Sequence, residues 1–307
     1  GAVALSAVVA LDLALAALPQ LRWVPARSLE EAVLPIARGQ PGRPPPRVYR
    51  DVARTDWSAI SYEGRAIVGA RTMVANLGAL FRVASVPGYE SAHDAEYHRV
   101  WDLLASQGGA TLRVFSVGHA ILAAGVADPA LAEIGVAPPL TVYAVRDPLP
   151  RAYLVGRAIH AARPDAAQLL APDVAFGHAA IVADAAAALD APAGRAGPCR
   201  FVSWAPARGE RRGDAARAAL QVLVDAHSRG WRVEVDGHAA AAVRVNGLVR
   251  GVRVPPGPHR IVWTYRPPAV AVGIAGSVAG VLCAVVLAWR RKARPVGRAE
   301  AASPLLS

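Results

Sequence analysis

Residues 231–289 read WRVEVDGHAAAAVRVNGLVRGVRVPPGPHRIVWTYRPPAVAVGIAGSVAGVLCAVVLAW, and they join a run of short strands to a long apolar segment. The last part, 269–289, holds no charged residue, and about 20 apolar residues cross a hydrocarbon core of ~30 Å as a helix. Arg290, Arg291, Lys292 and Arg294 follow this segment. Because an excess of Lys and Arg beside a span marks its cytoplasmic side, the sequence predicts a transmembrane helix over 269–289 and a cytoplasmic basic tail over 290–307. The region before the helix is then exocytoplasmic.

That preceding region has the pattern of a folded β domain. Asp236-Gly237 and Asn246-Gly247 are strong hairpin signals, because a type I′ turn needs a positive φ at both central residues. From about residue 200 apolar and polar residues alternate, which predicts a small β-sandwich over 196–268. Trp231 alternates with charged neighbours and shares a face with Val233 and Val235, so it is expected to anchor the core.

The N-terminal segment is also apolar. Residues 2–18 contain only Ser6 and Asp12 as polar residues, and a transmembrane helix is predicted over 1–18. The core of a signal peptide is the alternative, although neither a basic region before it nor a cleavage site after it is seen. Asp12 is expected either to face other helices or to lie near an interface. A connector rich in Pro and Gly follows over 19–46.

Between this connector and the sandwich we expect an α/β exocytoplasmic region over 47–195. Strands are predicted over 47–50, 112–125, 140–145 and 151–159, an amphipathic helix over 91–106, and partly helical structure over 164–190. The expected fold class is therefore an α+β exocytoplasmic region with a C-terminal small β-sandwich, flanked by two transmembrane helices.

Composition argues against several classes of function. The net charge of +11 invites a nucleic-acid interface, but the dense basic cluster lies beside the span and the other arginines are scattered, so no nucleic-acid partner is expected. The sequence lacks the common hydrolase, zinc-protease and phosphate-loop motifs. No cofactor and no catalytic residue is therefore assigned.

Histidine and cysteine give little more. In the group His93, Asp94, Glu96 and His98, only Asp94 and His98 share a helix face, and two ligands do not complete a metal site, so no metal site is assigned. His119 is expected to be a core histidine.

Cys199 and Cys283 are predicted to lie outside and within the membrane, respectively. They are therefore not expected to form a disulfide with each other.

The start of the chain suggests a longer protein. It opens on Gly1 and its only methionine is Met73. We therefore expect this sequence to be the C-terminal portion of a larger protein, with the catalytic part upstream.

Three blocks of the sequence resemble the YfhO family of bacterial integral membrane proteins. The matching residues of the first block lie near DPLPRAYL at 147–154, those of the second near 230–267, and those of a weaker third near NLGALFRVASVPGYES at 76–91. In the first block they are Tyr143, Asp147, Pro150, Arg151 and Tyr153. In the second they are Gly230, Trp231, Asp236, Gly237, Asn246, Arg250, Gly251, Val252, Pro256, Gly257, His259, Tyr265, Arg266 and Pro267. In the third they are Asn76, Gly88 and Tyr89. The resemblance covers most of the chain from residue 47 onward.

This resemblance implies a lipid-linked-sugar glycosyltransferase of the GT-C type in the bacterial inner membrane, with many spans and a large exocytoplasmic C-terminal region. A polyprenyl-phosphate-linked sugar, an envelope glycan acceptor, the bilayer and upstream transmembrane helices are the implied partners. Asn76, Tyr89 and Trp231 are the candidate substrate-binding residues. The chain departs from the family at His227-Ser228-Arg229, where an aromatic-aromatic-Pro run is usual, so a stacking platform for a sugar is not carried over there. A noncatalytic, membrane-anchored polysaccharide-binding or assembly module is the alternative function.

Overall fold

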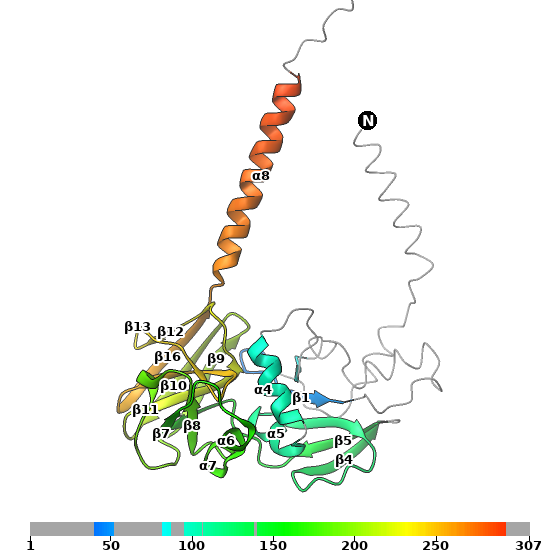
Figure 1. Cartoon of the computed structure of the whole chain (residues 1–307), viewed down its shortest axis with the longest axis vertical. Coiled ribbons are helices and arrows are strands. Elements are labelled where there is room, and N and C mark those ends of the chain that lie inside the picture. The colour runs from blue at the N-terminus through cyan, green and yellow to red at the C-terminus, as the bar shows by residue number, and fades with distance from the viewer. Residues whose placement is uncertain (1–39, 52–81, 87–94, 106, 138–139, 293–307) are drawn as a thin grey trace, which may run out of the picture.

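The computed structural model describes residues 40–51, 82–86, 95–105, 107–137 and 140–292 (Figure 1). Within these residues the protein is mostly β, with three sheets, a few short helices and one long C-terminal helix. The predicted helix over 1–18, most of the connector over 19–46 and the tail beyond residue 292 lie outside the described residues.

The first sheet, here the N-terminal sheet, has the order β2-β1-β3-β5-β4. Its strand β1 runs parallel to β2 and β3, and β5 runs antiparallel to β3 and β4. Two helices belong to this part, α4 (Ala95–Ala105) and α5 (Gly109–Val114). The strands are β1 (Arg47–Arg50), β2 (Ala84–Val86), β3 (His119–Ala123), β4 (Leu131–Ala137) and β5 (Leu140–Val145).

The strands predicted over 47–50 and 140–145 are confirmed, whereas the strand predicted over 112–125 is wrong in its first half. That half is helical at its start, as the end of α5, and the carboxylate of Asp128 accepts a hydrogen bond of 2.7 Å from the amide of Gly109 at the start of this helix. Ser116, at φ 58°, then turns the chain towards β3. The predicted helix over 91–106 is seen as α4, in which Val100 and Leu104 are fully buried.

The second sheet, here the middle sheet, has the order β6-β11-β15-β14-β8-β7. The short helices α6 (Ala166–Leu170) and α7 (Pro172–Ala175) and a 3₁₀ turn (Ala185–Ala187) lie between its strands in the sequence. The strands are β6 (Ala152–Val155), β7 (Arg157–His160), β8 (Ala179–Val182), β11 (Ala219–Ala226), β14 (Val243–Val245) and β15 (Val249–Val254).

The third sheet, here the outer sheet, has the order β13-β12-β16-β10-β9 and is antiparallel. Asp236 and Gly237, at φ 53° and 83°, form the turn between β12 and β13, and Asn246 and Gly247, at φ 47° and 71°, form the turn between β14 and β15. Both predicted hairpin turns are therefore confirmed. The strands are β9 (Cys199–Ala205), β10 (Arg208–Ala215), β12 (Trp231–Val235), β13 (His238–Ala240) and β16 (Gly257–Tyr265).

The middle and outer sheets pack as a sandwich around Leu154, Leu223 and Trp263, while the other face of the middle sheet packs on α4, α5 and the N-terminal sheet. Strand β11 therefore buries both faces. The pairing of β6 with β11 also crosses the boundary predicted at 195/196. That boundary divides a sheet, because the middle sheet takes strands from both sides of it.

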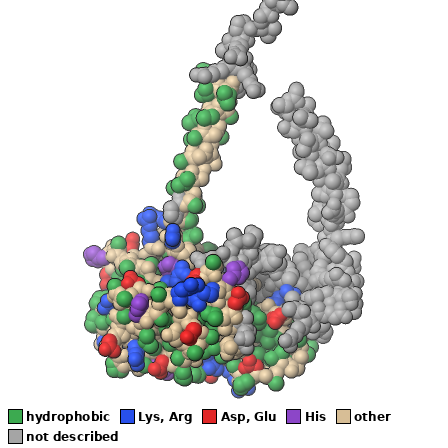
Figure 2. Space-filling model, in the orientation of Figure 1, with side chains coloured by type: hydrophobic (Ala, Val, Ile, Leu, Met, Phe, Trp, Pro, Cys, Tyr) green, Lys and Arg blue, Asp and Glu red, His purple; other side chains and the backbone are tan. Residues whose placement is uncertain are grey.

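Helix α8 (Pro268–Lys292) leaves the sandwich at the end of β16 (Figure 1). Its apolar part, Ala269–Leu287, is the one helix of the described chain that is long and apolar enough to cross a membrane. Apolar side chains cover α8 all along its exposed surface, and basic side chains lie beside its base (Figure 2). The apolar C-terminal helix is thus present as predicted over 269–289.

Candidate functional site

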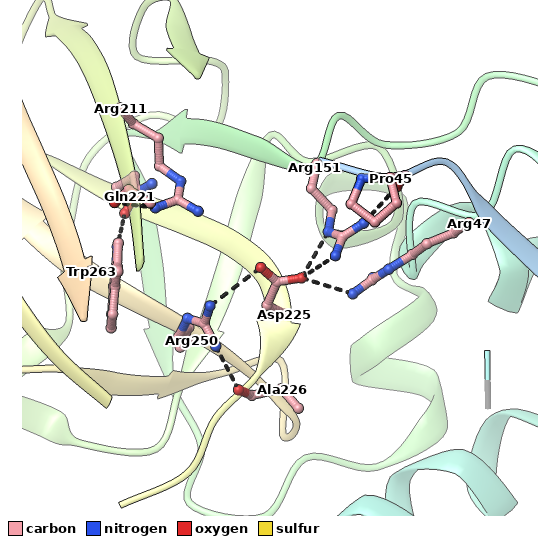
Figure 3. A network of polar contacts seen from close by, with 10 residues as sticks. Pro45, Arg47, Arg151, Arg211, Gln221, Asp225, Ala226, Arg250 and Trp263 are labelled. Carbon is pink, nitrogen blue, oxygen red and sulfur yellow. Dashed lines mark hydrogen bonds and ion pairs between the residues drawn. The ribbon is translucent and has the colours of Figure 1, made fainter. Parts of the chain in front are cut away.

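One carboxylate, that of Asp225, is the centre of a polar cluster between the sheets (Figure 3). Asp225 lies near the end of β11, on the face that Leu223 and Gln221 turn towards the outer sheet. The pairing of β11 with β15 is irregular between Leu223 and Ala226. This irregularity leaves the Asp225 side chain outside the regular ladder, where several arginines reach it.

Three arginines from separate parts of the chain bind this carboxylate. The Nη2 atom of Arg47 lies 2.9 Å from Oδ1 of Asp225, Nε of Arg151 lies 2.7 Å from the same oxygen, and Nη2 of Arg250 lies 3.3 Å from Oδ2 (Figure 3). Burial acts to raise the pKa of Asp225, but the charges of the three arginines outweigh it and hold that pKa below its ordinary value. Asp225 is therefore charged and joins three arginines from separate parts of the chain.

Backbone carbonyls hold the same arginines in place. Arg47 donates to the carbonyl of Phe115 at 2.7 Å, Arg151 to that of Pro45 at 3.2 Å, and Arg250 to that of Ala226 at 3.0 Å. The bond from Arg151 to Pro45, together with the ion pair between Arg47 and Asp225, ties the N-terminal sheet to the middle sheet.

Aromatic rings form the wall beside Arg250. Its guanidinium carbon lies 3.5 Å from the ring centre of Trp231 and 5.3 Å from that of Trp263. Trp263 is fully buried and donates from Nε1 to the side-chain oxygen of Gln221 at 3.1 Å. Trp231 in turn contacts Tyr265, with ring centres 5.0 Å apart. The guanidinium is therefore packed against tryptophan surface on one side and bound to Asp225 on the other.

A fourth arginine, Arg211 of β10, points into the sandwich and is only 1% exposed. It stacks on Phe201 with 4.5 Å between the guanidinium carbon and the ring centre, and it donates to the carbonyl of Gly209 at 3.1 Å. Gly209 leaves room for this group, since a Cβ there would come within 3.2 Å of the guanidinium nitrogens. Burial lowers the pKa of Arg211 to about 10 and that of Arg250 to about 9.

These side chains surround a cavity of about 330 Å³. Buried Arg211, Arg250 and Trp263 contribute to its lining together with exposed Ala205 and Arg208 of the turn between β9 and β10. The full lining is Arg151, Trp204, Ala205, Pro206, Arg208, Gly209, Arg211, Asp225, Ala226, Trp231, Arg250 and Trp263. We refer to it as the arginine cavity.

The arginine cavity lies at the end of the sandwich from which α8 departs. The amide of Tyr265 donates to the carbonyl of Ala207 in the β9–β10 turn at 2.8 Å, and the amide of Arg266 donates to the carbonyl of Gly230 just before β12. Helix α8 begins at Pro268. The residues around the cavity mouth are thus bound to the last residues before the apolar helix.

Of the three predicted substrate-binding residues, Trp231 lines this cavity, whereas Asn76 and Tyr89 lie outside the described residues. As expected from the strand period, Val233 on the same face is buried while Arg232 and Glu234 are exposed. Trp231 itself is only partly buried, because its ring forms one wall of the cavity.

Asp225, Arg47 and Arg211 were not singled out from the sequence. The available signal was polar residues at inward positions: Gln221 and Asp225 in an otherwise apolar strand, and Arg211 among small inward residues of β10. The resemblance did include Arg151 and Arg250, which the structure joins through Asp225.

A larger cavity, of about 540 Å³, lies in the N-terminal part beside Tyr49 and Trp101. Its Asp128 carboxylate is engaged by the amides of Gly109 and Ala130 at 2.7 and 2.8 Å. Because Asp128 is thus part of the loop structure, the arginine cavity is the stronger candidate.

Two histidines have clear surroundings. His119 is partly buried in β3, and burial lowers its pKa. His259 binds Asp236 through Nδ1 at 2.6 Å beside the β12–β13 turn, and this hydrogen bond raises the pKa of His259 and lowers that of Asp236. The pair of His259 and Asp236 connects the β12–β13 turn to β16.

No family model, curated protein or solved structure matches this chain. The resemblance to the YfhO family therefore stays a prediction.

Proposed function

We propose that the chain is the C-terminal exocytoplasmic portion of a YfhO-like bacterial membrane protein. In this proposal the whole protein is a multi-pass glycosyltransferase of the inner membrane that takes a sugar from a polyprenyl-phosphate donor and modifies cell-envelope glycans. Helix α8 anchors the β region to the bilayer and packs against other spans of the same protein.

The observation that carries the proposal is the place of the arginine cavity, at the α8 end of the sandwich. Ligand sites commonly combine apolar and aromatic walls with a few polar groups that fix orientation, and here Trp204, Trp231 and Trp263 stand beside guanidinium donors. A saccharide held there would lie next to the membrane surface, where the head of a lipid-linked sugar is presented.

Within the cavity, Asp225 is unsuited to act as a general base. A base works best when its pKa is near the operating pH, whereas the arginines around Asp225 depress its pKa further below neutrality. In this proposal the cavity therefore binds the saccharide, and another part of the protein carries out the transfer chemistry.

The same feature favours a second candidate, a noncatalytic module that binds or helps to assemble an envelope polysaccharide. It uses the same cavity and the same anchor, without any sugar transfer.

The two candidates are separated by an assay on membranes that contain the whole protein, supplied with a labelled polyprenyl-phosphate sugar and envelope glycan. We expect protein-dependent incorporation of label that falls in Trp204→Ala at an unchanged protein level. Val202→Ala is the matched control, because Val202 lies exposed on the same strand and outside the cavity. Glycan binding without transfer would favour the noncatalytic module, and the absence of both would refute the proposal.

A further inference from the structure

The arginine cavity carries more positive charge than its own carboxylate can balance. Three guanidinium groups of its lining, from Arg151, Arg211 and Arg250, surround the single carboxylate of Asp225, which leaves two positive charges in excess among the described residues that line its buried side. Arg208 adds another at the rim. Buried charges are costly unless they are paired, so an excess of this size in a folded interior requires a compensating partner.

The excess is concentrated at Arg211. No ion pair to a carboxylate is found for Arg211 among the described residues, although Arg47, Arg151 and Arg250 each have one. The buried Nε atoms of Arg211 and Arg250 also have no hydrogen-bond acceptor within the described part of the chain. Both side chains line the cavity. The buried side of the cavity is thus lined by guanidinium groups, and that of Arg211 has no carboxylate partner among the described residues.

Guanidinium groups bind phosphate and carboxylate oxygens through paired, charge-assisted hydrogen bonds. A carboxylate would neutralise one of the two excess charges, whereas a phosphate group neutralises one or two and offers more acceptor oxygens. The tryptophan walls leave space for the organic group that the phosphate carries. These features favour an organic phosphate over a carboxylate.

We propose that the arginine cavity is a binding site for a phosphate ester, held by Arg211 and Arg250 on the buried side and by Arg208 at the rim. Asp225 keeps Arg250 and Arg151 in position for this ligand. The cavity lies beside the start of α8, so the phosphate is supplied either by a lipid headgroup or by a soluble phosphorylated saccharide or polyol. The inference holds whether or not the protein transfers sugar.

The test uses the full chain in a non-ionic detergent that carries no phosphate, and it follows thermal unfolding. Glycerol 3-phosphate is added to one sample, with sodium chloride of equal ionic strength as the reference, and phosphatidylglycerol is added to a second sample. Stabilisation by glycerol 3-phosphate indicates a soluble ligand, and stabilisation by phosphatidylglycerol alone indicates a headgroup. A wild-type protein stabilised by neither would overturn the proposal.

The decisive variant is Arg211→Gln, and its matched control is Arg212→Gln, because Arg212 is exposed on the opposite face of the same strand. We expect affinity for the phosphate probe to fall about tenfold or more in Arg211→Gln, as for loss of a charge-assisted hydrogen bond. Without the probe, this variant should unfold at an unchanged or higher temperature, because an unpaired buried charge is gone. Arg212→Gln should behave like the wild type.

A purely structural Arg211 would give the reverse result, with lower stability and unchanged affinity, and that outcome overturns the proposal. If Arg211→Gln does not fold, Arg208→Gln decides the question. Arg208 is exposed at the rim, so its loss should weaken phosphate binding at unchanged stability. Unchanged binding in Arg208→Gln would then refute the proposal.

Discussion

Replacing Asp225 with Asn removes the charge that holds three arginines together while keeping the size of the side chain. The carboxylate receives hydrogen bonds at 2.9, 2.7 and 3.3 Å from Arg47, Arg151 and Arg250, and its side chain is only 13% exposed. Removing one partner of a buried ion pair destabilises a protein by ~3–5 kcal/mol. With about 2–4 °C for each kcal/mol in a domain of this size, the unfolding temperature should fall by about 6–20 °C.

The effect should also depend on pH in a defined direction. The folded pKa of Asp225 lies below its ordinary value, so the stability it contributes is present above the unfolded pKa of about 3.9. This contribution is lost as the pH falls through the folded pKa. The difference between wild type and Asp225→Asn should therefore be constant near neutral pH and shrink below about pH 4.

Thermal unfolding of the full chain in detergent, followed by tryptophan fluorescence, measures the difference. The control is Glu210→Gln, because Glu210 binds Arg260 at 2.6 and 2.9 Å on the surface, with the Arg260 side chain 49% exposed. Exposed ion pairs contribute little, so this variant should unfold close to the wild type. An Asp225→Asn protein no less stable than Glu210→Gln would show that the cluster does not stabilise the fold.

Three other changes test separate parts of the structure. Trp231→Ala should lower the unfolding temperature by more than a substitution at an exposed position does, because the ring packs on the guanidinium of Arg250 and on the ring of Tyr265. Calorimetry that finds no decrease would contradict this packing. His259→Gln should cost more stability at low than at high pH in a denaturant titration. The pKa of His259 is raised in the folded state, so its contribution to stability is present below about pH 6.5 and is lost as the pH rises through the folded pKa. A pH-independent cost would contradict the pairing with Asp236. Gly276 and Gly280 lie four residues apart on one face of α8. Replacing both with Leu should weaken cross-linking of α8 to the other spans of the proposed whole protein without preventing insertion, since small residues let helices approach closely in a bilayer. Unchanged cross-linking would exclude this face as the contact.

The features that the sequence predicted well are local ones. Helix α8 follows from one uninterrupted apolar run, and the two hairpin turns follow from Asp-Gly and Asn-Gly pairs whose φ angles are positive as required. The strand period also placed Trp231 and Val233 on one face, because this alternation depends only on neighbouring residues.

The sheet partners could not be read from the sequence, because they depend on contacts between distant segments. Leu220 alternates with Gln221, which suggests one buried and one exposed face, yet both are fully buried because the middle sheet is covered on both faces at β11. Segment 112–125 illustrates the same limit, since α5 begins at Gly109, whose amide donates to the carboxylate of Asp128, a residue 19 positions further along the chain.

The site was the least predictable part. Arg47 and Asp225 are 178 residues apart, and no local pattern indicates that they meet. Arg151 and Arg250 lie in two separate blocks of the resemblance to the YfhO family, whereas only the structure shows that both bind Asp225.

The central claim is that the arginine cavity belongs to an exocytoplasmic domain and opens beside the membrane. Its most direct test is labelling of Ala205→Cys, at the exposed cavity mouth, in a protein whose Cys199 and Cys283 have been replaced by Ser. Intact cells are treated with a membrane-impermeant maleimide before and after lysis. The account predicts full labelling of Cys at this position in intact cells, and labelling that occurs only after lysis would contradict it.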